Sequence, residues 1–180
     1  QLQSLIHGDL NTGSIFINEE STKVFDPEFC FYGPMGYDIG NVIANMIFAW
    51  ANGDAAGAAD FCKWVEDVLV DVINMTKEKM EKYYDEHVTD TMCRNELYKK
   101  YYMDTIIEDT SAVAGLELIR RIVGMANVKD ITTIADEAKR ARAEKICITA
   151  AIDFIKNRSD KKCGKCFLKT LKDAIAEVDA

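Results

Sequence analysis

The position of the prolines constrains the fold more than any other feature of the sequence. The 180-residue chain contains only two, Pro27 and Pro34, and half of its ten glycines also lie within the first 40 residues. Because proline removes a backbone donor and breaks helix interiors, residues 35–180 are free to form long helices. The sequence therefore predicts a short, turn-rich segment followed by a helical body.

Apolar side chains recur at steps of three and four beyond residue 38, which is typical of amphipathic helices. The first run covers Ile39–Trp50, and we expect Gly53 to cap its C-terminus and Asp54 to cap the start of the next helix. Further helices are expected over residues 61–87, 97–128, 134–155 and 167–178.

In front of these helices, residues 14–17 and 23–25 are apolar and β-branched and flank the polar turn 18–21. This pattern predicts a β-hairpin. An isolated hairpin is marginal in water, so we expect it to lie against the helices. The predicted fold class is α+β, predominantly helical.

The charge and cysteine content exclude several classes of protein. A formal net charge of −8 argues against nucleic acid or an anionic membrane as the main partner. The six cysteines do not form a disulfide framework, so we expect reduced thiols in the cytoplasm. Cys163 and Cys166 have the spacing of half a zinc site, but without a second pair a surface turn is favoured.

Asp9 stands in the string Leu5–Ser14, directly after a glycine and an apolar strand. A carboxylate on such a tight turn lies at the rim of the core, where an acid or base can meet a substrate hydroxyl. Taken alone, His-Gly-Asp is more often a loop with a capping aspartate.

A second acidic motif is Asp26-Pro27-Glu28. Proline favours an extended conformation of the residue before it, and residues i and i+2 of an extended chain point the same way. Two carboxylates that point to the same side suit Mg²⁺, which usually takes one or two carboxylates and shares its remaining coordination positions with phosphates. Taken alone, this tripeptide is a common turn.

A catalytic aspartate, a hairpin and a metal-binding acidic pair follow one another in kinase active sites. The two motifs together resemble the aminoglycoside phosphotransferase and choline kinase superfamily. The fuller strings HGDLNTGSIF and DPEFCFYGPMGYDIGN are similar to those of its methylthioribose kinase family. The resemblance implies transfer of the γ-phosphate of ATP to the 1-hydroxyl of S-methyl-5-thioribose, in methionine salvage.

The resemblance also implies that residues 1–180 form part of the C-terminal lobe of a protein-kinase-like fold. The N-terminal nucleotide-binding lobe would then lie outside this sequence, and we expect the isolated chain to be inactive. The implied partners are a small sugar and ATP, with Mg²⁺ as cofactor and no nucleic acid or membrane. The oligomeric state, including a homodimer of the full-length protein, stays open.

Several site residues are implied by matching positions of the family motifs. Asp9 would be the catalytic aspartate, and Asp26 and Glu28 would hold Mg²⁺ on the ATP phosphates. Ser14 occupies the position where the superfamily often has asparagine as a further metal ligand.

Three other positions in these strings bear on the loop itself. His7 would have a structural role, and Asp38 would brace the catalytic loop. Asn11 replaces the histidine usual in the methylthioribose branch, which bears on substrate contacts near the loop.

Arg120 and Arg121 are adjacent in an otherwise apolar helical stretch. Adjacent helical residues diverge by about 100°, so both guanidiniums cannot easily face water and need anionic partners. The family has a paired-arginine motif, which makes both residues candidates for binding the transferring phosphate and the sugar. A structural ion pair with Glu108, Asp109 or Glu117 is the alternative.

Other functions remain open at this stage. A choline or aminoglycoside kinase is the nearest alternative within the superfamily, and a catalytically inert helical module is the alternative outside it. A protein kinase is disfavoured because the Asp-Phe-Gly and Ala-Pro-Glu signatures are missing.

Overall fold

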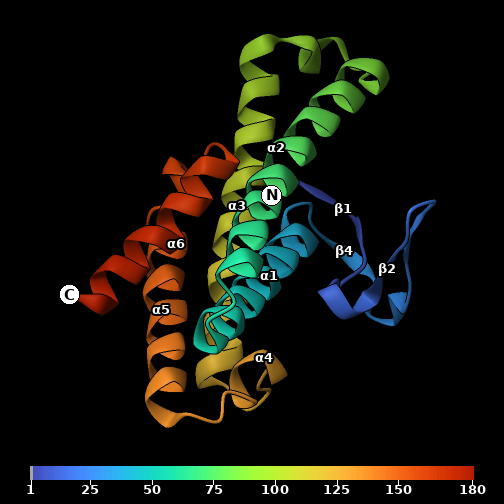
Figure 1. The fold of residues 1–180 in the computed structure, drawn as a ribbon. Helices are drawn as coiled ribbons and strands as arrows, with labels where there is room; N and C mark the ends of the chain where they lie inside the picture. Colours follow the sequence, from blue (N-terminus) through green and yellow to red (C-terminus); the bar gives the residue numbers. More distant parts are fainter. Residues whose placement is uncertain (1) are drawn as a thin grey trace.

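The computed structural model describes residues 2–180 and consists of a helical body with a small β element beside it (Figure 1). This arrangement confirms the predicted α+β, predominantly helical class. The helices are α1 (Tyr37–Ala56), α2 (Ala59–His87), α3 (Glu96–Val123), α4 (Lys129–Thr132), α5 (Glu137–Lys156) and α6 (Gly164–Asp179).

The β element contains two separate antiparallel pairs. The predicted hairpin is formed by β2 (Ile15–Ile17) and β3 (Thr22–Val24). A second pair, which the sequence did not predict, joins β1 (Gln3–Ile6) to β4 (Phe31–Pro34). This pairing brings the two ends of the segment 7–30 together, so both acidic motifs lie on one short loop system.

The expectation that the hairpin lies against the helices is wrong. Phe16 and Ile17 on β2 are 64% and 74% exposed. The Phe16 ring instead stacks on Phe25, with ring centroids 4.5 Å apart. The hairpin therefore projects from the helical body and is stabilised mainly by its own strands.

The core lies between the helices. In the body α3 packs against α1 and α5, while α6 covers α5 and α2. Phe48, Phe154 and Phe167 are fully buried there, and the last two rings lie 5.3 Å apart. Within residues 2–180, the longest apolar helical stretches fall short of what a membrane crossing requires.

The predicted junction between the first two helices is wrong. Gly53 does not end α1 but lies inside it, where an added Cβ would come within 2.7 Å of the Phe61 ring. Gly57, with φ of +75°, is the residue that ends the helix. Asp54 caps no helix and instead forms an ion pair with Arg142 of α5. Tertiary packing thus shifts the boundary by one turn.

The later boundaries also differ by a few residues. Helix α3 ends at Val123 rather than near 128, and α5 begins only at Glu137. Its N-cap is Asp136, whose carboxylate accepts a hydrogen bond of 3.0 Å from the backbone N–H of Lys139.

One charged cluster ties the end of α5 to α6. Asp153 accepts hydrogen bonds from Lys161, Thr170 and Asn157. Partial burial raises the pKa of Asp153, but these hydrogen bonds outweigh it and lower the value to about 2.

Candidate active site

The loop after β1 has a backbone that requires glycine at position 8. Gly8 has φ of +84°, and a Cβ at this position would lie 2.1 Å from the carbonyl oxygen of Phe29. The carboxylate of Asp38, at the start of α1, accepts hydrogen bonds from the backbone N–H groups of His7 (2.6 Å) and Gly8 (3.0 Å). Asp38 thereby fixes the turn that presents Asp9.

The His7 ring joins the two acidic motifs. Its Nε2 lies 2.8 Å from the carbonyl oxygen of Phe25. A carbonyl can only accept, so Nε2 carries the proton and Nδ1 is left as an acceptor. The backbone N–H of Asp9 is 3.4 Å from that Nδ1. The His7 ring therefore holds the Asp9 turn beside the residue that precedes Asp26.

The backbone at Asp26 differs from the prediction. It is left-handed (φ 67°, ψ 52°) rather than extended, and residues 27–29 form a 3-10 turn. Proline disfavours the right-handed helical region for the residue before it, and aspartate is among the few residues that tolerate the left-handed one. The argument that Asp26 and Glu28 point the same way because the chain is extended is therefore wrong.

Asp26 and Glu28 offer carboxylate oxygens, the type of donor that magnesium takes when it is shared with phosphates. Both side chains are exposed, and neither has a hydrogen-bond or ion-pair partner within residues 2–180. Ser14 is held close by, since its carbonyl oxygen accepts a 3.2 Å hydrogen bond from the N–H of Phe25. The described residues contain no cluster of three or more potential ligands. Mg²⁺ commonly binds one or two protein carboxylates and leaves most of its coordination positions to phosphate oxygens and water.

Both candidate arginines are held by one buried carboxylate. Glu117, only 6% exposed, accepts hydrogen bonds from Arg120 (2.7 and 3.1 Å) and from Nε of Arg121 (2.7 Å). Of the three acidic partners left open by the sequence, the structure selects Glu117. The Arg120 side chain stays 54% exposed, so its guanidinium can still meet a second anion.

Asp9 contributes to the electrostatic surroundings of Arg120 although the two residues lie more than a hundred positions apart in the sequence. Arg120 donates hydrogen bonds to Glu117, which raise the pKa of its guanidinium most, and the negative charges of Glu117 and Asp9 raise that pKa further. The close crossing of α1 and α3 makes this possible. An added Cβ at Gly40 would lie 2.7 Å from the carbonyl oxygen of Thr110.

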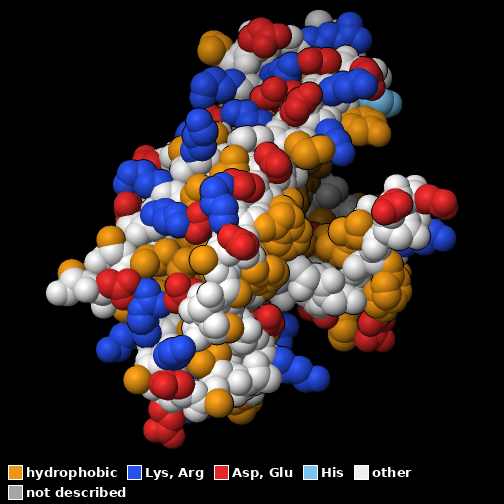
Figure 2. Space-filling view, in the orientation of Figure 1, with side chains coloured by type: hydrophobic (Ala, Val, Ile, Leu, Met, Phe, Trp, Pro, Cys, Tyr) orange, Lys and Arg blue, Asp and Glu red, His pale blue; other side chains and the backbone are white. Residues whose placement is uncertain are grey.

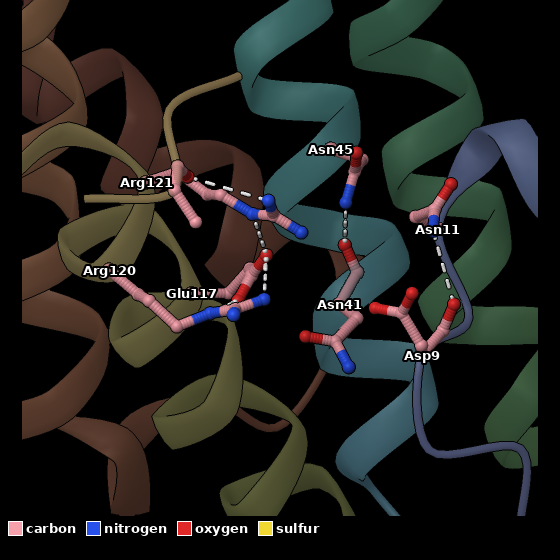
Figure 3. A network of polar contacts seen from close by, with 8 residues as sticks. Asp9, Asn11, Asn41, Asn45, Glu117, Arg120 and Arg121 are labelled. Atoms are coloured by element: carbon pink, nitrogen blue, oxygen red, sulfur yellow. Dashed lines mark hydrogen bonds and ion pairs between the residues drawn. The ribbon is translucent and has the colours of Figure 1, made fainter. Parts of the chain in front are cut away.

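Asn41 is a candidate site residue that the sequence analysis missed. It lies one turn after Tyr37 and Asp38 on α1 and is buried. Figure 3 shows its side-chain amide in the space between Asp9 and the Glu117–Arg120 pair. The amide makes no hydrogen bond with another residue of 2–180, so both its donor and its acceptor are available. The only sequence signal was its position on the helix that carries Asp38.

Asn11 does not join this polar face. Its side-chain oxygen accepts a 2.9 Å hydrogen bond from the N–H of Gly13, and its amide donates to the carbonyl oxygen of Asp9 (3.1 Å). Its hydrogen bonds therefore shape the loop after Asp9.

Comparison with known proteins indicates the class of enzyme to which this chain is similar. Residues 2–69, which contain both acidic motifs and Asp38, match the phosphotransferase enzyme family. The more similar curated relatives are methylthioribose kinases. The chain is 37% identical over 175 residues to methylthioribose kinase 1 of Oryza sativa subsp. japonica. It is 36% identical over 154 residues to the methylthioribose kinase of Bacillus pumilus (strain SAFR-032). These similarities confirm the resemblance that the two strings predicted.

The matches cover most of this chain but a smaller part of each relative. The rice alignment covers 87% of this chain and 40% of the relative, and the Bacillus alignment covers 86% and 38%. The chain thus spans about two fifths of the length of the relatives that it matches.

Proposed function

We propose that the protein containing this chain is a kinase that transfers the γ-phosphate of ATP to the 1-hydroxyl of S-methyl-5-thioribose. The observation that carries the proposal is the single site built from Asp9, Asp38 and the Glu117–Arg120 pair. The relatives named methylthioribose kinase support this acceptor in preference to choline or an aminoglycoside.

Asp9 would orient the acceptor hydroxyl and receive its proton. A general base must reach that proton, and the braced turn holds the Asp9 carboxylate facing the space beside Arg120. The exposed Arg120 guanidinium would bind the transferring phosphoryl group, and the buried Glu117 would keep it aimed there. Arg121, held by the same carboxylate, would act with Arg120 toward the sugar and phosphate.

Asp26 and Glu28, with Ser14 near them, would hold Mg²⁺ and through it the ATP phosphates. Bound there, the ion would neutralise charge on the phosphoryl group during transfer. The His7 bridge would keep these ligands at a fixed distance from Asp9, because its ring contacts the backbone on both sides.

We also propose that residues 1–180 belong to the C-terminal lobe and that a nucleotide-binding lobe covers the β element. Figure 2 shows hydrophobic side chains gathered over the strands at the right of the view. Members of this apolar surface are 44–74% exposed: Phe16, Ile17, Val24, Phe29, Phe31 and Tyr32. Exposed apolar area of this kind is characteristic of an interaction surface.

A coupled assay of ADP release tests the acceptor. The full-length protein is offered methylthioribose, choline and an aminoglycoside at matched concentrations with Mg·ATP. Strong preference for methylthioribose is expected, and preference for choline would replace the acceptor but leave the kinase assignment standing. The isolated 180-residue chain should show negligible turnover, and rates near those of the full-length protein would refute the proposed two-lobe organisation.

A further inference from the structure

The cysteines of the described chain differ sharply in their surroundings. Cys62 and Cys147 are buried, and burial raises the pKa of both, to about 12 for Cys147. Such thiols are unreactive. Cys30 is exposed and Cys93 is half-buried.

Cys163 and Cys166 form a close pair at the start of α6. Their Sγ atoms lie 3.1 Å apart, and both side chains are half-buried, so solvent can reach them. Cys163 is the N-cap of the 16-residue helix, and Cys166 lies in its first turn. Residues three apart in a helical turn place their Cβ atoms about 5–6 Å apart, and a disulfide requires an approach to about 3.5–4.5 Å. A small adjustment of this turn would therefore allow the bond.

The surroundings of the pair favour a thiolate. Partial burial raises the pKa of Cys166, but hydrogen bonds from the Cys163 thiol and from the Lys162 and Cys163 backbone outweigh it and lower the pKa. Lys161 adds a further favourable charge. Helix N-termini and neighbouring lysines are the environments in which Cys-X-X-Cys thiols become reactive.

We propose that Cys163 and Cys166 are a redox-active dithiol that closes to a disulfide when a peroxide is present. The Cys166 thiolate attacks one peroxide oxygen, the O–O bond breaks and hydroxide leaves, which gives a sulfenic acid; the hydroxide takes up the proton that the thiol had released and becomes water. The Cys163 sulfur then attacks the Cys166 sulfur, the S–S bond forms and a second water leaves. Two thiols thus lose two electrons to one molecule of hydrogen peroxide. An added dithiol restores both thiols by thiol–disulfide exchange and is itself oxidised to a disulfide.

The consequence of closure would be local to the contact of α6 with α2. The backbone N–H of Gly164, between the two cysteines, donates a 2.9 Å hydrogen bond to the side chain of Asn74 on α2. None of these residues belongs to the candidate active site, so the proposal does not depend on the proposed kinase activity.

Tryptic mapping of the full-length protein tests the proposal directly. Trypsin cleaves after Lys162, Lys165 and Lys169, so residues 163–165 and 166–169 leave as separate peptides unless a disulfide joins them. After native treatment with a small molar excess of hydrogen peroxide and quenching by alkylation, we expect the two peptides as one linked species, lighter than their sum by two hydrogens. Dithiothreitol should release them.

Matched variants separate the outcomes. Cys163→Ser and Cys166→Ser should each abolish the linked species, whereas Cys30→Ser should leave it unchanged. The proposal is overturned if the two cysteines stay reduced while Cys30 oxidises, or if they bond to other cysteines. Stoichiometric zinc that is retained on dialysis and requires both thiols, with no linked species after peroxide, would overturn it in favour of a metal site.

Discussion

Replacing Asp38 by asparagine should separate the bracing of the catalytic loop from the general stability of α1. Its carboxylate accepts two backbone hydrogen bonds, of 2.6 and 3.0 Å, and a bond to a charged acceptor contributes about 1.5–3 kcal/mol. The asparagine side chain keeps one oxygen that can accept a backbone hydrogen bond. Its NH₂ group would face the other backbone N–H, so that hydrogen bond is lost. Since the half-buried loop can be partly rehydrated, we expect Asp38→Asn to lower the free energy of unfolding by about 2 kcal/mol.

Two measurements check this magnitude. Urea unfolding of the chain, followed by circular dichroism, should show a midpoint lowered by about 1 M for a slope of about 2 kcal/mol/M. In the full-length protein, kcat should fall by about 100-fold, because a displacement of about 1 Å at a catalytic group can cost that much. The control is Asp67→Asn, which removes an exposed pair with Lys63 and should cost less than about 1 kcal/mol. Equal unfolding midpoints and kcat values for the two variants would refute the bracing role.

Four further predictions follow from the same geometry. Asp9→Asn should lower kcat by about 10²–10⁴-fold and leave Mg·ATP binding, measured by calorimetry, unchanged; an unaltered kcat would remove Asp9 from the mechanism. Asn41→Leu should raise KM for methylthioribose without changing KM for ATP, and equal KM values would place Asn41 outside the acceptor site. Glu117→Gln should destabilise the chain by about 2 kcal/mol in urea, because two guanidiniums lose their charged acceptor; a loss below about 0.5 kcal/mol would show that water replaces it. The stabilisation by Asp153, whose pKa is lowered to about 2, should be complete above the ordinary carboxyl pKa of 3.8 and lost as the pH falls through 2, so wild type and Asp153→Asn should converge there.

The helices and the hairpin could be predicted because their signals are local. Spacing of apolar residues at three and four and the absence of proline after residue 34 are properties of short windows of sequence. The boundary between α1 and α2 could not be predicted in the same way. Gly53 is an apparent stop signal, but Phe61 packs against it from the next helix, and the left-handed position falls to Gly57 instead.

In the candidate site, too, local features could be predicted and contacts between distant residues could not. The two acidic motifs are contiguous strings, and the sequence places them close together through the hairpin. The pairing of β1 with β4 and the choice of Glu117 as partner of both arginines depend on contacts between distant parts of the chain. The left-handed backbone of Asp26 belongs with these, because proline excludes one conformation without selecting between the others.

Helix α1 explains why the part of the candidate site around Asp9 is held by packed helices, whereas the part around Asp26 and Glu28 is not. Its first turn supplies Asp38, which holds the Asp9 turn, and its Gly40 lets α3 approach closely enough to bring Arg120 to the same face. The residues proposed to bind the acceptor are therefore positioned by packed helices. Asp26 and Glu28 instead lie on an exposed turn beside an exposed hairpin and have no partner in the described chain. On the proposed function, ATP would need contacts from a second lobe before these carboxylates could hold its metal in line with Asp9. The helical body alone would then be expected to position an acceptor without phosphorylating it.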